Sequence, residues 1–339
     1  MRQLIFHGHR RLGVEEAEPA ALGPGEVRVD VRAVGICGSD VHGYVGANDR
    51  RVPGMVMGHE ACGIVSERGA GVEAPAVGTP VAINPAVTCG GCEYCLTPGR
   101  DNLCPSRRLY GCVRELPGAF ADTVVVRAEN VVELDGPSPL EWGALVEPLA
   151  VGDHGAALAR GTLERGVLVI GGGPIGIGAA LSARRRGVTR VVVSEPQPHR
   201  RAVADTLGLE THDPRGPGAR PDPFDAAIDC VAAPATLRSA LELIQPGGDV
   251  VLVGLGQPEL PLPVTPVVVG ERAVRGAFNY TRESFVDVTR WAMSGTVDLS
   301  PIIESRVDLD GLVGAFAEYA EGTRPDVKTI LARPPAGDA

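Results

Sequence analysis

Three side chains near the start of the chain have the types and spacing of a zinc site. The stretch Gly35–His42 reads G-I-C-G-S-D-V-H, and Gly58–Glu60 reads G-H-E. Cys37, His59 and Glu60 offer a thiolate, an imidazole and a carboxylate, all of which zinc accepts as ligands. Three protein ligands leave one coordination position open, and an open position distinguishes a catalytic zinc from a structural one. We therefore predict that these residues bind a catalytic zinc ion.

Two polar residues follow the cysteine at a spacing suited to proton transfer. Ser39 and His42 lie two and five residues beyond Cys37, where they can carry a proton away from a hydroxyl group bound at the metal. Taken singly, Cys37 is better explained as a buried cysteine, and Ser39 and His42 are better explained as ordinary surface polar groups. Together with the motifs below they favour catalysis, and we predict catalytic roles for Ser39 and His42.

A fourth candidate for this site is Glu147. It lies in Trp142–Asp153, which reads W-G-A-L-V-E-P-L-A-V-G-D, an apolar helical stretch. Burying a carboxylate in such surroundings is costly unless it is paired or meets a metal. The alternative is a glutamate stabilised in the first turn of a helix. We favour a role for Glu147 at the metal site.

Four of the eight cysteines are clustered. Cys89, Cys92 and Cys95 form a C-x-x-C-x-x-C run, and Cys104 follows closely. Four thiolates complete a tetrahedron around one zinc ion and leave no open position, so such a metal stabilises a loop and takes no part in chemistry. An iron–sulfur cluster can use similar spacing, but nothing else in the sequence suggests electron transfer. We predict a structural zinc.

A glycine-rich motif begins the second half of the chain. Val167–Ile170 is a continuous apolar run, as expected of a parallel strand covered on both faces. It leads into G-G-G-P-I-G, a G-x-G-x-x-G pattern whose glycines allow a tight turn and a close approach to a pyrophosphate. Because this pattern follows a strand and opens a helix, it predicts dinucleotide binding. The residues predicted to contact the cofactor here are Gly171, Gly173, Pro174, Ile175 and Gly176.

The next apolar run ends in an acidic residue. Glu195 follows Val191–Ser194 at the distance where an acid hydrogen-bonds the adenosine ribose, and its charge disfavours a 2′-phosphate. Arg200 and Arg201 weaken this argument, since an arginine can accommodate that phosphate. We predict NAD rather than NADP as cofactor, with Arg200 near the adenine. We also expect Val253 and Phe278 to contact the cofactor.

Length and composition indicate an ordinary soluble protein of about two domains. Of the 339 residues, 44% are hydrophobic and 22% charged, and the formal net charge is −10. Such a chain has no basic field for nucleic acid or anionic lipid, so neither is an expected partner. Lys328 is the only lysine. The use of arginine elsewhere indicates codon bias, and we draw no functional prediction from it.

Nothing in the sequence predicts a membrane span or export. The uncharged window 166–183 is long enough to raise a transmembrane interpretation, but it contains Pro174 and changes from a strand pattern to a helix pattern. The N-terminal residues have neither a long apolar run nor a cleavage site. With metal-type cysteine spacing as well, we expect a cytoplasmic protein with reduced thiols.

The elements that position these motifs follow two patterns. Up to about residue 150 short strands dominate, for example Val27, Val29 and Val31 alternating with charged residues. From Gly166 strands alternate with helices, which predicts an open parallel sheet, and the runs Val267–Gly270 and Ala273–Phe278 complete about six strands. The last 60 residues predict helices near 283–294 and 309–321, and a closing strand at 327–331 that can return to the first sheet.

In this order the motifs resemble the zinc-dependent medium-chain dehydrogenase/reductase family, in particular its sorbitol and butanediol dehydrogenase branch. The resemblance implies an α/β protein with a GroES-like β-rich catalytic domain, 1–152 and 280–339, and a doubly wound Rossmann domain, 153–279. It implies that Glu147 is a direct ligand or the partner of zinc-bound water. It also implies that Ser39 and His42 form the proton path.

The substrate is the least determined property. Where sorbitol dehydrogenases have an arginine before a tyrosine, this chain has Asn279, which can both donate and accept hydrogen bonds. Together with Tyr44, Phe120 and the polar loop 43–51, it predicts a small-molecule secondary alcohol or ketone with a second polar group: a polyol, vicinal diol, cyclitol or amino-alcohol. The rival hypotheses are a zinc-independent reductase of the same superfamily and a non-catalytic dinucleotide sensor.

The predicted last strand of the parallel sheet also bears on assembly. If Ala273–Phe278 is an edge strand, a twofold mate can pair with it and cover its unpaired backbone groups. We therefore expect a homodimer or a homotetramer built as a dimer of dimers.

Overall fold

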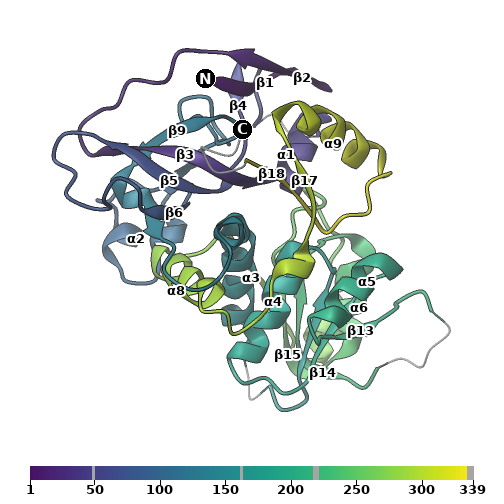
Figure 1. Ribbon diagram of the computed structural model, residues 1–339. Helices are drawn as coiled ribbons and strands as arrows, with labels where there is room; N and C mark the ends of the chain where they lie inside the picture. Colours follow the sequence, from purple (N-terminus) through teal and green to yellow (C-terminus); the bar gives the residue numbers. More distant parts are fainter. Residues whose placement is uncertain (48–49, 161–162, 217–220, 334–339) are drawn as a thin grey trace. The chain divides into compact units, whose positions relative to one another are not determined.

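The computed structural model describes residues 1–47, 50–160, 163–216 and 221–333, which divide into two compact units (Figure 1). Unit 1 comprises Met1–Glu147 and Phe285–Ala339, and unit 2 comprises Pro148–Ser284. The chain passes from one unit to the other inside α3 (Val146–Leu158) and again inside α8 (Arg282–Met293). Unit 1 therefore draws on both ends of the sequence.

Unit 1 is built around a mainly antiparallel sheet. Its strand order is β10-β6-β5-β3-β18-β17, and β9 also pairs with β3. The strands of this sheet are β3 (Glu26–Gly35), β5 (Glu60–Arg68), β6 (Pro80–Ile83), β9 (Thr123–Arg127), β10 (Val131–Glu133), β17 (Ile303–Val307) and β18 (Lys328–Ala332). Smaller sheets contain β1 (Arg2–Gly8), β2 (Arg11–Glu16), β4 (Met55–Val56), β7 (Ala86–Val87) and β8 (Arg108–Leu109).

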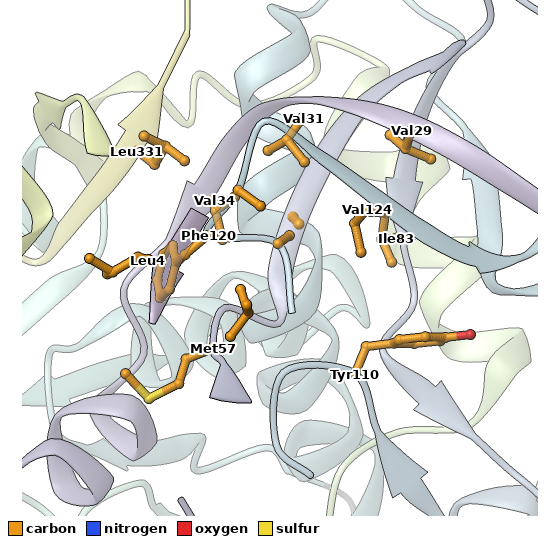
Figure 2. Close-up of a cluster of buried hydrophobic side chains, with 14 of the residues drawn as sticks. Leu4, Val29, Val31, Val34, Met57, Ile83, Tyr110, Phe120, Val124 and Leu331 are labelled. Carbon is orange, nitrogen blue, oxygen red and sulfur yellow. The ribbon is translucent and has the colours of Figure 1, made fainter. Parts of the chain in front are cut away.

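The core of unit 1 follows from the alternation in β3. Val27, Val29 and Val31 are fully buried, and they pack with apolar side chains from the neighbouring strands. Figure 2 shows Val29 and Val31 in this core. One side of this core is closed by α9 (Leu309–Glu321), whose Leu312 and Phe316 are fully buried. Both the predicted strand and the predicted helix are confirmed. The shorter helices of this unit are α1 (Gly38–Tyr44), α2 (Glu93–Leu96), η1 (Asp101–Leu103), η2 (Ala128–Asn130), η3 (Leu140–Leu145) and η4 (Ser300–Ile302).

The predicted closing strand returns to the first sheet. β18 pairs antiparallel with β3, with Ile330 opposite Gly35, and parallel with β17. The C-terminal part of the chain is thus placed beside the segment that carries the predicted zinc ligands.

Unit 2 is a parallel sheet of the doubly wound type. Its strand order is β13-β12-β11-β14-β15-β16, and all its pairings are parallel. The strands are β11 (Val167–Ile170), β12 (Val191–Ser194), β13 (Glu210–His212), β14 (Phe224–Asp229), β15 (Ile244–Leu252) and β16 (Ala273–Gly276). The helices between them are α4 (Pro174–Arg185), α5 (Pro198–Thr206), α6 (Pro234–Leu243) and α7 (Val264–Val269). The predicted fold class is confirmed.

One expected strand is wrong. The run Val267–Gly270 does not extend the sheet, because Val264–Val269 forms helix α7. Pro266 has no N–H to give a neighbouring strand, and Val268 and Val269 are 67% and 79% exposed. β-Branched residues favour a strand mainly when they pack in a sheet, so this exposed run has no such preference for an extended backbone.

Within the described part of the chain, the helices are all too short or too polar to cross a membrane.

Candidate active site

The strand register of unit 1 brings the three predicted zinc ligands together. Gly35 at the end of β3 lies opposite Glu60 at the start of β5. Cys37 follows Gly35 by two residues and His59 directly precedes Glu60. All three side chains therefore lie at the adjacent ends of two neighbouring strands. Their ligand atoms lie within 4.8 Å of one another. A thiolate, an imidazole and a carboxylate at this separation fit a zinc ion with one open position.

The histidine ligand is backed by a buried ion pair. Asp40 is completely buried, and its Oδ2 lies 3.5 Å from Nδ1 of His59, which leaves the other ring nitrogen for a metal. Oδ1 of Asp40 accepts a hydrogen bond from Nη2 of Arg51 at 2.8 Å. Burial acts to raise the pKa of Asp40, but the charges of His59 and Arg51 outweigh it and lower this pKa to about 2. Asp40 is therefore a permanent anion beside the imidazole.

The carboxylate ligand has a cationic partner. Nζ of Lys328, the first residue of β18, donates to Oε2 of Glu60 at 2.6 Å and to the carbonyl oxygen of Ile36 at 2.9 Å. Burial acts to lower the pKa of Lys328, but the charges of Glu60 and Cys37 raise it, so the ammonium group keeps its proton. A Cβ at Gly35 would overlap Oε2 of Glu60, so glycine makes room for this carboxylate.

The predicted proton path lies on α1. Cys37 is the residue before the first turn of this helix, and Oγ of Ser39 donates to Sγ of Cys37 at 3.4 Å. Nη2 of Arg51 donates to Oγ of Ser39 at 3.4 Å. His42 lies in the last turn and is exposed. The structure thus places Ser39 next to a zinc ligand and His42 at the surface of the same helix.

Glu147 is placed differently from the other three candidates. It is buried in the first turn of α3, and it is outside the group of ligand atoms formed by Cys37, His59 and Glu60. Its role at the metal stays a prediction.

The cysteine cluster has the geometry of a tetrahedral site. The ligand atoms of Cys89, Cys92, Cys95 and Cys104 all lie within 4.8 Å of one another. Sγ of Cys95 is 3.5 Å from Sγ of Cys92 and 3.8 Å from Sγ of Cys89. A zinc–sulfur bond of about 2.3 Å gives a tetrahedron edge of about 3.8 Å. Hydrogen bonds from the backbone of Gly91 and Cys92 lower the pKa of Cys89 to about 6, which favours the thiolate that zinc binds.

The glycine motif joins β11 to α4 in the predicted way. Gly171 has a φ of 104°, which favours glycine, and a Cβ at Gly176 would overlap the carbonyl oxygen of Gly171. A Cβ at Gly173, the residue before the helix, would meet nothing within 4 Å. Pro174 occupies the first helical position, and Ile175 follows it. The open space at Gly173 therefore lies where the helix N-terminus attracts a phosphate.

Two family models match most of the chain. Residues 23–136 match the alcohol dehydrogenase GroES-like domain, and residues 174–294 match the zinc-binding dehydrogenase domain. The chain belongs to the zinc-binding dehydrogenase family. It is a zinc-dependent medium-chain dehydrogenase, as the motifs indicated, and therefore an oxidoreductase.

Relatives of this dehydrogenase include enzymes named for polyols and sugar acids. It is 34% identical to L-idonate 5-dehydrogenase of Vitis vinifera, over 88% of this chain and 85% of that protein. It is 36% identical to sorbitol dehydrogenase of Arabidopsis thaliana, over 84% and 82%. The structure of 2R,3R-butanediol dehydrogenase from Bacillus subtilis superposes with a TM-score of 0.87, at 27% identity, over 98% and 99%. Other solved structures that match at a TM-score of 0.87 hold NADP or NADH.

The carboxylate of Glu195, the acidic residue predicted to contact the ribose, is held in place by backbone groups. Oε2 of Glu195 accepts from the N–H of Gly172 at 2.8 Å, and Oε1 accepts from the N–H of Gln197 at 2.8 Å. Arg201 donates to the carbonyl oxygen of Glu195 and forms an ion pair with Asp213 at 3.0 Å. The carboxylate of Glu195 is thus fixed beside the glycine motif, and Arg201 is engaged elsewhere.

The other predicted cofactor residues belong to the same unit. Arg200 lies on α5, and its Nε has no hydrogen-bond partner among the described residues. Val253 directly follows β15 and is buried, whereas Phe278 lies two residues beyond β16 and is 39% exposed. Their contacts with the cofactor stay predictions.

The three predicted substrate residues have different environments. Tyr44 and Phe120 are buried in the core of unit 1, where both rings pack against Phe316, and the hydroxyl of Tyr44 donates to the carbonyl oxygen of Arg10 (Figure 2 shows Phe120). Both therefore have a packing role in this structure, and their contact with substrate stays untested. Asn279 is buried in unit 2 at a φ of 57°, and its Nδ2 has no partner among the described residues. Asn48 and Asp49 of the predicted loop lie outside the described residues.

Sequence reasoning missed the charged residues behind the ligands. Asp40 lies inside the G-I-C-G-S-D-V-H motif and Arg51 at the end of the polar loop 43–51, and the sequence around neither residue indicates its role. Lys328 was noticed as the only lysine, and its position in a predicted strand aimed at the first sheet was the available signal. These three charged residues belong to the candidate site of the dehydrogenase together with the predicted ligands.

Proposed function

We propose that the protein oxidises a secondary alcohol to a ketone with NAD as hydride acceptor, and catalyses the reverse reaction. The observation that supports this most is the convergence of Cys37, His59 and Glu60 within 4.8 Å, with the Ser39 hydroxyl 3.4 Å from the thiol. A zinc ion bound by these residues supplies a Lewis acid that makes the hydroxyl of a bound alcohol more acidic. Oxidation of R₂CHOH by NAD⁺ then gives R₂CO, NADH and one proton, which the protein must remove.

The proton leaves through α1 in this proposal. The hydroxyl of Ser39 accepts the proton of the substrate hydroxyl and at the same time passes its own proton on. The hydrogen bond from Arg51 holds the oxygen of Ser39 in place. His42 lies one turn further along the same helix and is exposed, so it can deliver the proton to water. NAD, when bound, would supply the nicotinamide ring that accepts the hydride of the carbinol carbon.

NAD is the proposed cofactor because Glu195 presents a fixed negative charge at the end of β12. A 2′-phosphate placed there would meet the carboxylate, and Arg201, one of the two arginines that could compensate for it, is paired with Asp213. One unfavourable charge contact of about 1.4 kcal/mol corresponds to a tenfold preference.

Asn279 supports a substrate with a second polar group. A buried amide without a partner costs about 1–3 kcal/mol, and the left-handed backbone of a non-glycine residue adds to that cost. We assign to Asn279 the recognition of a hydroxyl or amino group beside the reacting carbinol. The names of the relatives, which refer to idonate, sorbitol and butanediol, agree with this substrate class.

A substrate panel tests the proposal. The purified protein is assayed for NADH formation with 2,3-butanediol, sorbitol, inositols, aminocyclitols and 2-butanol, and the best substrate is repeated with NADP. We expect kcat/KM for the best bifunctional alcohol to exceed that for 2-butanol by at least about tenfold, and NAD to exceed NADP by about tenfold. Asn279→Ala should reduce only the first ratio, because it removes the donor and leaves the reacting hydroxyl untouched.

The possible outcomes separate the hypotheses. Equal turnover of 2-butanol would contradict the polar-pocket argument but keep an alcohol dehydrogenase. Reduction of activated double bonds without added metal would favour the zinc-independent reductase. Tight NADH binding without turnover of any alcohol or ketone would favour the sensor.

We further propose that two copies pair through β16 and that the protein is cytoplasmic. β16 is the last strand in the order of the parallel sheet. Leu255, Val264, Val268 and Val269 on the neighbouring segment are each more than 60% exposed. The proposed thiolate ligands require a reducing compartment, which supports the cytoplasm.

A further inference from the structure

The single lysine of the chain is buried at the candidate zinc site. All other Lys and Arg positions, 32 in total with Lys328, are arginines. The side chain of Lys328 is only 3% exposed. Burying an ammonium group is costly unless every charge is compensated, so this position has a specific requirement that composition does not explain.

The contacts of Lys328 identify that requirement. Two of its three N–H groups donate to Oε2 of Glu60 and to the carbonyl oxygen of Ile36, at 2.6 Å and 2.9 Å. The register of three adjacent strands fixes these partners, since Gly35 pairs with Glu60 on one side and with Ile330 on the other. The ammonium group therefore holds one oxygen of a predicted zinc ligand through rigid elements on both sides.

We propose that Lys328 is a positioning residue of the zinc site, which holds one oxygen of Glu60 and thereby makes Glu60 a ligand through its other oxygen. The inference rests on the proposed function, because it concerns the same metal site. With Lys328 in place, the ligand set of one thiolate, one carboxylate and one neutral imidazole gains a compensating positive charge. The site then carries a net positive charge when a divalent ion is bound.

A lysine suits this position better than an arginine. An ammonium group is a compact point charge that fits between two oxygens, whereas a guanidinium is a planar fork with five donors. Oε2 of Glu60 lies against Gly35, where there is no space even for a Cβ. The larger guanidinium of an arginine would therefore displace this carboxylate. We therefore expect Lys328→Arg to perturb the metal site although it preserves the charge.

The rival explanation is a buried ion pair with a purely structural role. Loss of one partner would then destabilise the fold but leave the binding of metal unchanged. The chain offers a control in the same sheet: Nε of Arg28 in β3 donates to Oε1 of Glu67 in β5 at 2.8 Å, in the register pair Arg28–Glu67. Arg28→Met breaks that pair and leaves the zinc ligands untouched.

The wild-type chain itself gives the first measurement. Protein labelled with [¹⁵N]lysine has a single lysine side-chain resonance, which reports on Nζ of Lys328. We expect this resonance to shift when the more weakly held zinc is removed by a chelator and to return when zinc is restored. A resonance that does not respond to zinc would overturn the inference without any variant.

The variants give the second measurement. In Lys328→Met we expect zinc at the catalytic site to bind about 10–100-fold more weakly in a chelator competition. The visible bands of the cobalt-substituted site should move, because Glu60 changes its mode of binding. NADH binding and the zinc of the cysteine cluster should be unchanged. Lys328→Arg should show a smaller change of the same bands, and Arg28→Met should show none.

Two results would count against us in distinguishable ways. If Lys328→Met loses stability but keeps the wild-type cobalt spectrum and zinc affinity, then Lys328 is only structural. If the wild type itself binds one zinc per chain, at the cysteine cluster alone, the proposed function fails, and the inference with it.

Discussion

At the scale of residues, the candidate site is a set of ligands with charged neighbours of opposite sign. Asp40 faces His59, and Lys328 holds Glu60. Arg51 completes the first of these pairs and also donates to Ser39. The ligands decide which metal can bind, and the neighbours decide how each ligand is oriented.

Asp40→Asn tests the neighbour of the histidine. The substitution leaves the buried guanidinium of Arg51 without its counter-charge, which costs about 3–5 kcal/mol of unfolding free energy, and it weakens zinc binding about 10–100-fold. Urea unfolding and chelator competition at pH 7 measure the two effects. The control is Glu67→Gln, whose partly exposed ion pair should contribute less than about 1 kcal/mol.

The same carboxylate predicts a dependence on pH. The folded-state pKa of Asp40, about 2, lies below its ordinary value of 3.8. Its ionised form therefore contributes stability that is fully present above about pH 4 and lost as the pH falls towards 2. The stability difference between wild type and Asp40→Asn should be constant between pH 5 and pH 8 and shrink below pH 4. A difference that grows on acidification would contradict the assignment of a lowered pKa.

At the scale of elements, the proposed function depends on two features: the neighbouring ends of strands β3, β5 and β18, and the turn from β11 to α4. The first places zinc ligands through strand register. The second presents backbone N–H groups at the start of a helix, where a pyrophosphate is stabilised.

Two glycines of the turn give a matched pair of variants. A Cβ at Gly176 would overlap the carbonyl oxygen of Gly171, so Gly176→Ala should lower the stability of the folded protein by about 1–3 kcal/mol. A Cβ at Gly173 meets nothing, so Gly173→Ala should melt like the wild type but bind NADH at least about tenfold more weakly, since the methyl group enters the phosphate position. Thermal melting and NADH fluorescence separate the two. Unchanged NADH affinity in Gly173→Ala would place the pyrophosphate elsewhere.

The elements also show what the sequence could and could not predict. The cysteine cluster and the glycine motif each have a recognisable local spacing, and the ligand atoms of the four cysteines lie within 4.8 Å of one another. Lys328 is 268 residues from Glu60, and a spacing of that length carries no signal until the strand order is known. The residues of Val267–Gly270 favour strands and predict an extension of the sheet. The segment forms a helix instead, because its valine side chains are exposed and Pro266 lacks a backbone N–H. Tertiary context determined both cases.

At the scale of the whole molecule, the proposed dimer follows from an edge strand and an exposed apolar segment. Light scattering at micromolar concentration should give twice or four times the chain mass of 35.2 kDa. Val269→Asp places a charge on a side chain that is 79% exposed, and it should shift the protein towards monomer. Val77→Asp, at a residue of unit 1 that is 57% exposed, is the control and should leave the mass unchanged. A wild type that scatters only as a monomer would exclude the proposal.

The position of β18 between β3 and β17 has a consequence for synthesis of the chain. The predicted zinc ligands at 37–60 leave the ribosome well before β18, the strand that lies next to β3 and supplies Lys328. Unit 2 is continuous in sequence and can fold as soon as residue 284 is available, whereas the central sheet of unit 1 must wait for its final strands. A nascent chain can thus complete unit 2 before the candidate metal site, and a chain released before β18 is translated has Cys37, His59 and Glu60 without the strand that supplies Lys328.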